Sequence, residues 1–226
     1  DRTARWHARF DDGEEVVARF VINGSGGLHK PLIPAFEGRE KFAGTSMHTA
    51  RWNNDFDATG KDIALIGSAA SAIQVLPAIA PDARRVTMYQ RTPNYVLPRN
   101  DFAYSDTHKK WFARLPLISR LYGRFKFYFL ELRLFNIIVK GEVRRKRADE
   151  VKRYIRYRFR GRAQRHAAVQ DYEMGCKRIL VSDDYYDALN RDDVEVITEP
   201  IEHGTSTGVA SGDGTVRKFD AIIYAT

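Results

Sequence analysis

The sequence contains a single cysteine, Cys176, and no run of about 18 consecutive apolar residues. One cysteine excludes a disulfide framework and a cysteine-built zinc site, and we expect no metal centre. The lack of a long apolar run excludes a membrane-spanning helix. The chain also does not open on a basic and then apolar signal segment, so we expect a cytoplasmic protein.

The two ends of the chain lack the features of a complete protein. It begins at Asp1 without an initiator Met and stops at Thr226 inside an apolar run, which predicts an internal piece of a longer protein. Its 226 residues suffice for one large domain or two small ones. With 43% hydrophobic and 29% charged residues, the composition predicts a folded core rather than disorder.

The formal charge of +8 is unevenly distributed. Between His108 and His166 there are 19 Lys and Arg against 4 Asp and Glu, a net charge of +15, so the rest of the chain carries −7. Such a block can bind nucleic acid, a membrane surface or an anionic cofactor. It has no nucleic-acid fingerprint, and its aromatic residues cluster with Leu and Ile, so we expect packed helices and no nucleic-acid partner. Peripheral membrane contact through Leu117–Ile138 stays open.

Periodicity and turn residues predict the elements. Alternation on both sides of Asp11-Asp12-Gly13 predicts a β-hairpin over residues 3–10 and 15–22. Strands over Ile63–Ile66 and Arg85–Gln90 enclose a helix over Ser71–Ile79, which together form a βαβ unit.

The second half of the chain continues this alternation after a helical stretch. Residues 106 to about 170 are helical in composition, and Ser182 is placed to cap a short helix that ends at Leu189. Further strands are expected over Val194–Thr198, Gly204–Gly212 and Thr215–Tyr224. The order predicts an α/β fold that is Rossmann-like and carries an inserted helical block.

A turn of small residues lies between the first predicted strand and helix of this unit: Gly67-Ser68-Ala69-Ala70-Ser71-Ala72. It has the spacing of the dinucleotide fingerprint G-x-G-x-x-G/A, with Ala69 at the second glycine position; the alternative is a plain strand–helix turn. The next strand ends at Arg91-Thr92, where an NAD-binding unit usually carries an acidic residue. A guanidinium and a hydroxyl suit a 2′-phosphate, so we favour NADPH over NADH.

A second pattern lies immediately upstream of this turn. Phe42, Gly44, His48 and Trp52 form F-x-G-x-x-x-H-x-x-x-W. As a set they resemble the fingerprint of the type I Baeyer–Villiger monooxygenases, which are class B flavoprotein monooxygenases of the flavin-containing monooxygenase superfamily. Asn53 replaces the usual Pro or Asp. Related N-oxygenating enzymes share the Phe, Gly and His but typically not the Trp, so Trp52 favours the Baeyer–Villiger group.

The resemblance extends over nearly the whole chain. Gly24-Ser25-Gly26 resembles the family's first Ala-Thr-Gly segment, where the FAD domain joins the NADPH domain, and residues 220–226 resemble the second. The implied domains are the end of an FAD-domain segment with the linker fingerprint (1–56), two halves of the NADPH domain (57–102 and 173–200), a helical insertion (103–172) and a return to the FAD domain (201–226).

A third site is Gly175-Cys176-Lys177-Arg178. An isolated Lys-Arg pair is ordinarily a surface feature, and Cys176 is interpreted as a small packing residue. The resemblance implies that Lys177 helps to hold the 2′-phosphate of the cofactor. It also implies that Arg178 is catalytic, at the junction of flavin and nicotinamide.

The resemblance implies an FAD- and NADPH-dependent monooxygenase that inserts one oxygen atom of O₂ into a ketone through a C4a-peroxyflavin. Arg178 would stabilise negative charge, and His48 and Trp52 would couple domain position to cofactor binding. The family's first FAD fingerprint is not in the sequence, so we expect this piece to be inactive alone. One alternative is an N- or S-oxygenating flavin monooxygenase. The other is a non-catalytic basic module that binds lipid or nucleic acid.

Overall fold

The computed structural model describes residues 4–26, 30–138, 141–159 and 161–226, and the chain forms two compact units, Asp1–Leu32 and Ile33–Thr226. The first unit holds an antiparallel hairpin of β1 (Trp6–Arg9) and β2 (Glu15–Ala18). Its register pairs Trp6 with Ala18, which confirms the hairpin predicted around Asp11-Asp12-Gly13.

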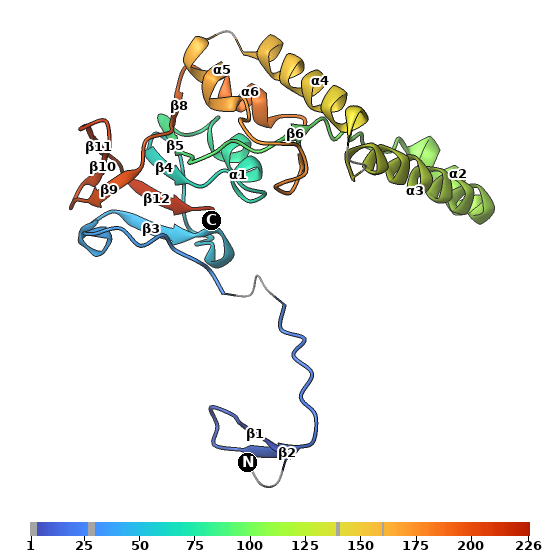
Figure 1. The fold of residues 1–226 in the computed structure, drawn as a ribbon, viewed down its shortest axis with the longest axis horizontal. Helices are drawn as coiled ribbons and strands as arrows, with labels where there is room; N and C mark the ends of the chain where they lie inside the picture. Colours follow the sequence, from blue (N-terminus) through green and yellow to red (C-terminus); the bar gives the residue numbers. More distant parts are fainter. Residues whose placement is uncertain (1–3, 27–29, 139–140, 160) are drawn as a thin grey trace. The chain divides into compact units, whose positions relative to one another are not determined.

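The second unit is built on a five-stranded parallel sheet (Figure 1). Its strand order is β3 (Thr45–His48), β12 (Ala221–Tyr224), β4 (Asp62–Ile66), β5 (Arg85–Tyr89) and β8 (Val194–Ile197). Strands buried on both faces are apolar throughout, which explains the continuous runs in β4 and β12. The predicted βαβ unit is confirmed, with α1 (Ala72–Ile79) between β4 and β5.

Each face of this sheet is covered by a different kind of layer. Ile63 and Leu65 of β4 pack in one cluster with α1, α6 (Tyr185–Leu189) and two residues of α4 (Glu142–Arg158). The alternate residues Ala64 and Ile66 pack on the other face against Val209. This face is covered by the antiparallel strands β9 (Ile201–Gly204), β10 (Gly208–Ser211) and β11 (Val216–Lys218) (Figure 1). The result is a three-layered α/β fold.

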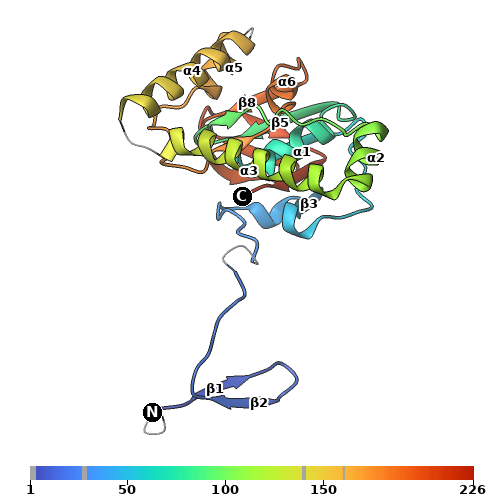
Figure 2. The same ribbon diagram turned by 90° about the vertical axis from the view of Figure 1, so that its right-hand side faces the viewer.

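The helical block is confirmed. It consists of α2 (Asp106–Arg114), α3 (Pro116–Ile138), α4 and α5 (Arg162–Ala168), and both α2 and α4 contact α3 (Figure 2). α4 is tied to the core through Val151 and Ile155, whereas α2 buries no residue. Within the parts of the chain that the structure describes, none of the helices combines the length and the apolar character needed to cross a bilayer.

The end of the chain differs from the sequence prediction in two strands. Gly204–Gly212 is not one strand, because β9 ends at Gly204 and β10 begins at Gly208 after a turn. Thr215–Tyr224 is also divided: β11 pairs antiparallel with β10, and β12 enters the parallel sheet between β3 and β4. The break falls at Phe219-Asp220, which contains neither Gly nor Pro and so gives no turn signal.

Several short elements were not predicted. β6 (Val96–Leu97) and β7 (Leu180–Val181) form a two-residue parallel ladder, and single 3₁₀ turns cover Arg39–Lys41 and Thr49–Arg51. The predicted role of Ser182 is confirmed, since its Oγ accepts the N–H of Tyr185 at 3.1 Å at the start of α6.

Candidate functional site

The carboxyl ends of β4 and β12 lie side by side in the sheet. From β4 the chain continues through α1 to β5 on one side, whereas β12 and β3 lie on the other. In open α/β sheets, ligands bind in the crevice at such a reversal of strand order. The turn 67–72 follows β4 directly and therefore occupies the position where a ligand is expected.

Gly67 is the point at which this turn meets the end of β12. Its φ is +124°, and a Cβ there would lie only 2.4 Å from the carbonyl oxygen of Ala225. The Gly67 N–H donates to the oxygen of Tyr89 at 2.9 Å, and the Ala225 N–H donates to the oxygen of Ile66 at 2.8 Å. The turn can pass against the second segment only because this residue has no side chain.

The turn leads into the N-terminus of α1. The N–H groups of Ala69, Ala70 and Ser71 have no acceptor among the described residues, and the Ser71 side chain makes no capping bond. Free N–H groups at a helix start, together with the helix dipole, form a site for an anion. This arrangement fits a pyrophosphate.

Lys177 lies beside the same turn although it is distant in sequence. Its Nζ donates to Oγ1 of Thr92, 85 positions earlier, and lies 4.7 Å from the centre of the Tyr172 ring. Ser68 Oγ donates to the Thr92 carbonyl at 3.0 Å, and Asn94 Nδ2 donates to the Ser68 carbonyl at 2.7 Å. Lys177, Thr92 and the turn therefore form one continuous hydrogen-bonded group.

Three further side chains fasten the segment before Lys177 to the loop after β5. Tyr172 Oη donates to the Pro93 carbonyl at 3.0 Å, and Tyr95 Oη donates to the Tyr172 carbonyl at 3.0 Å. Gln170 Nε2 donates to the Asn94 carbonyl at 2.7 Å. Burial raises the pKa of Tyr172 to about 12, so its hydroxyl remains a donor. Sequence reasoning missed these residues; the turn sequence Thr92-Pro93-Asn94 was the available signal.

Arg91 and Arg178 flank this group in sequence. Both are exposed, and neither makes a hydrogen bond or ion pair with another described residue. The Arg91 guanidinium, which has no acidic partner among the described residues, suits a dianionic phosphate together with the Lys177 ammonium and the Thr92 hydroxyl. Cys176 is exposed, so its interpretation as a packing residue is wrong.

The Phe and Gly of the upstream fingerprint have packing roles. Phe42 packs in the apolar cluster between the sheet and β9–β11. A Cβ on Gly44 would lie 2.6 Å from the Phe42 ring and 2.6 Å from the Asp220 carbonyl oxygen. The same carbonyl oxygen accepts a hydrogen bond from the Thr45 N–H at 3.1 Å. The spacing F-x-G therefore lets β3 begin directly beside β12.

The His and Trp of the fingerprint lie at the other end of β3. His48 is buried; its Nδ1 accepts the Ala50 N–H at 3.0 Å, so Nε2 carries the proton and donates to the Thr226 carbonyl at 3.2 Å. His48 thus links the end of β3 to the end of β12. Trp52 is 37% exposed and meets Phe56 edge to face, with the ring centres 6.2 Å apart.

Gly24-Ser25-Gly26 belongs to the first unit. Asn23 Oδ1 accepts the N–H of Ser25 at 3.0 Å and its hydroxyl at 2.7 Å, which forms a local turn. The group around Lys177 and the turn 67–72 is built entirely from the second unit.

Comparison with known proteins agrees with this geometry. No family model matches the chain. Over all 226 residues the chain is 37% identical to a Baeyer–Villiger monooxygenase of Pseudomonas aeruginosa, of which it covers 43%. The chain is homologous to the Baeyer–Villiger monooxygenases. This homology confirms the resemblance seen in the fingerprint, and the chain spans about half the length of the curated relatives it matches.

Two solved structures share the fold of this chain. The NADP-bound structure of an oxidized steroid monooxygenase is 29% identical, with a TM-score of 0.79 over 100% of this chain and 50% of that one. The OTEMO complex with FAD and NADP is 26% identical, with a TM-score of 0.82 over 99% and 50%. The predicted α/β class is thereby confirmed.

Proposed function

We propose that the chain forms the NADPH-binding part of an FAD- and NADPH-dependent Baeyer–Villiger monooxygenase. The observation that carries the proposal is the contact of Lys177 with Thr92 at the carboxyl ends of the parallel strands, beside exposed Arg91. The start of α1 would hold the pyrophosphate of NADPH. Arg91, Thr92 and Lys177 would hold the 2′-phosphate.

The end of β5 supports NADPH over NADH. An NAD-binding unit places a carboxylate there for the ribose hydroxyls, but β5 is followed by Gln90 and Arg91. Gln90 is buried and its Nε2 donates to the Ala167 carbonyl at 2.5 Å, so its amide is already occupied. Arg91 is left as the side chain that can reach the ribose, and a guanidinium binds phosphate in a bidentate manner.

The reaction would be the insertion of one oxygen atom of O₂ into a ketone, which gives an ester or a lactone. When bound, FAD reduced by NADPH would supply the activation of O₂. Arg178 would contribute a fixed positive charge where negative charge develops, and a charge that is already in place lowers the barrier without reorganisation. Its neighbour Lys177 is anchored on Thr92, which holds the backbone of Arg178 near the cofactor site.

The whole enzyme would need more than these residues. The relatives are about twice as long as this chain, and β4–α1 is the strand–turn–helix with dinucleotide spacing that the described residues contain. We assign this motif to NADPH. Gly24-Ser25-Gly26 and residues 220–226 would contribute to the FAD side, and turnover would require the full-length protein.

An N- or S-oxygenating flavin monooxygenase is the competing function, because it uses the same cofactors. The full-length protein should be supplied with NADPH, O₂ and either cyclohexanone or a tertiary amine, and the products identified by mass spectrometry. The proposal expects lactone from the ketone. Amine oxide without lactone would contradict it.

The outward face of α3 favours a second role, peripheral contact with an anionic membrane. Six side chains spaced three or four residues apart are each between 42% and 66% exposed: Ile118, Leu121, Phe125, Tyr128, Leu132 and Phe135. Arg120 and Arg124 flank this stripe, and apolar stripes bordered by basic residues bind lipid interfaces.

The chain should sediment with phosphatidylserine vesicles, and Phe125→Asp should reduce binding while Val143→Asp, outside the stripe, should not. No sedimentation of the parent chain would reject this role.

A further inference from the structure

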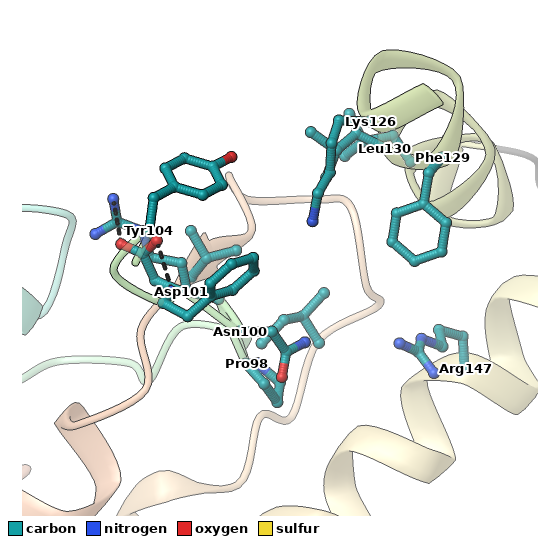
Figure 3. Close-up of a pocket in the computed structure, with 13 residues that line it drawn as sticks. Pro98, Asn100, Asp101, Tyr104, Lys126, Phe129, Leu130 and Arg147 are labelled. Carbon is teal, nitrogen blue, oxygen red and sulfur yellow. Dashed lines mark hydrogen bonds and ion pairs between the residues drawn. The ribbon is translucent and has the colours of Figure 1, made fainter. Parts of the chain in front are cut away.

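A cavity of about 820 Å³ lies between α3 and the loop that follows β6 (Figure 3). Its walls are mostly apolar and include Leu97, Phe102, Phe129, Leu130, Leu134 and Val181. The volume falls in the range of about 300–1,000 Å³ that is usual for small-molecule pockets. Neither the turn 67–72 nor Thr92 nor Lys177 lines it, so it is separate from the dinucleotide site.

Three polar side chains point into this cavity from different elements: Lys126 from α3, Arg147 from α4 and Asn100 from the loop (Figure 3). Lys126 Nζ lies 5.5 Å from the centre of the Phe102 ring and 5.6 Å from that of Tyr122. It makes no ion pair with a carboxylate among the described residues. Its ammonium group is therefore held by aromatic faces and is available to an anion.

The charge lining the cavity is positive. Arg99 is neutralised by Asp101, at 3.2 Å, and both line the cavity. Arg147 pairs with Glu150 at 2.8 Å, but Glu150 does not line the cavity and both side chains are partly exposed. Lys126 thus faces the apolar space without a carboxylate partner among the described residues, and Arg147 uses only Nη1 in its pair with Glu150, so its other N–H groups remain donors. An anion bound there would be attracted by both.

The loop wall of the cavity is preformed. Asn100 adopts φ +53°, a left-handed conformation that asparagine tolerates. Asp183, two residues after the end of β7, holds this turn by hydrogen bonds. The carboxylate of Asp183 accepts the N–H groups of Arg99, Asn100 and Asp101 at 2.9, 3.0 and 3.0 Å. Three bonds to one carboxylate fix the backbone of this turn, and with it the point from which the Asn100 side chain extends.

We propose that this cavity binds a molecule with an apolar body and a single carboxylate. The carboxylate lies between Lys126 and Arg147, with the Asn100 amide as a further donor. The apolar chain lies along Phe129, Leu130 and Leu134. This inference goes beyond the proposed oxygenation, because the residues it uses are not those assigned to the cofactors.

Calorimetric titration of the full-length protein with sodium octanoate and with 1-octanol tests the proposal. The two probes share the same chain length, and only octanoate is charged. Octanoate should bind at least about ten-fold more tightly than octanol. Lys126→Gln and Arg147→Gln should each weaken octanoate binding by about ten-fold, because each removes one charge-assisted contact, and should leave octanol binding unchanged.

The matched control is Lys146→Gln. Lys146 is on the same helix as Arg147 and carries the same charge, but it pairs with Glu142 at 3.0 Å and does not line the cavity. Its substitution should leave octanoate binding at the parental level. Circular dichroism confirms that each variant is folded. Equal affinity for octanoate and octanol, or no octanoate binding by the folded full-length parent, would overturn the proposal.

Discussion

Gly67 and Gly44 are required because neighbouring backbone leaves no room for a side chain. Sequence reasoning identified both glycines from their motifs, and the structure supplies the physical cause at each position. Gly67 meets the Ala225 carbonyl and Gly44 meets the Asp220 carbonyl. Both contacts join the end of the chain to segments about 160–180 residues earlier, and no local pattern in a sequence can reveal them.

Substitution of Gly67 should therefore lower the free energy of unfolding by more than the strain of its backbone angle alone would. Gly67→Ala, at φ +124°, places a Cβ 2.4 Å from a backbone oxygen, whereas Gly141→Ala has a comparable positive φ, +106°, and no atom within 4 Å. The free energy of unfolding should fall by about 1–3 kcal/mol more for Gly67→Ala, the usual cost of overpacking. Urea denaturation of both variants measures this difference. Equal losses would show that the contact with Ala225 is not restrictive.

Arg178 is predicted to act on the oxygenation step. In the full-length protein, Arg178→Ala should lower the rate of lactone formation by about 10²–10³-fold, because a preorganised charge is removed. Arg178→Lys should recover little, since a flexible ammonium does not reproduce the planar guanidinium. FAD content, measured by absorbance, should stay at the parental level. An alanine variant that forms lactone at the parental rate would remove the catalytic assignment.

Among the secondary-structure elements, those with strong local patterns were predicted correctly. β4, α1, β5 and the β1–β2 hairpin have clear periodicity and turn residues. β3 was missed because Thr45-Ser46-Met47-His48 is a polar run whose strand character comes from pairing with β12. β6 and β7 contain two residues each, too few for any periodicity, and they exist because the loop after β5 meets the segment before α6.

Asp183 connects these short elements, and its contribution should depend on pH. Hydrogen bonds from the N–H groups of Asp101, Asn100 and Arg99 lower its pKa. A carboxyl group whose folded pKa is depressed stabilises the fold above its unfolded pKa of about 3.9, and this stabilisation disappears as the pH falls through the folded pKa.

The comparison of the parent chain with Asp183→Asn isolates this effect. The parent should be more stable near pH 7, and the difference in unfolding free energy should shrink as the pH falls below about 4. Urea denaturation between pH 7 and pH 3 measures it. A difference that is constant over this range would show that the Asp183 charge does not hold the loop.

At the scale of the whole molecule, the candidate site combines segments that are far apart in sequence. Lys177 and Thr92 are 85 positions apart, with the helical block between them, and Tyr172 and Gln170 hold the two segments together. Periodicity placed β4, β5 and β8, but only the family resemblance suggested that Lys177 and Arg91 share one phosphate. We propose accordingly that residues 57–102 and 173–200 form one NADPH-binding domain, and β12 from the 201–226 segment completes its sheet.

The proposed NADPH-binding function is tested most directly by calorimetry, which measures the preference of the chain for NADP⁺ over NAD⁺. The two ligands differ only in the 2′-phosphate, so the parent chain should bind NADP⁺ about ten- to a hundred-fold more tightly. Arg91→Ala and Lys177→Ala should each reduce this preference without weakening NAD⁺ binding. Arg85→Ala should not reduce it, because Arg85 lies at the amino end of β5, the opposite end of the strand from Arg91. Equal affinity of the parent chain for NADP⁺ and NAD⁺ would contradict the account.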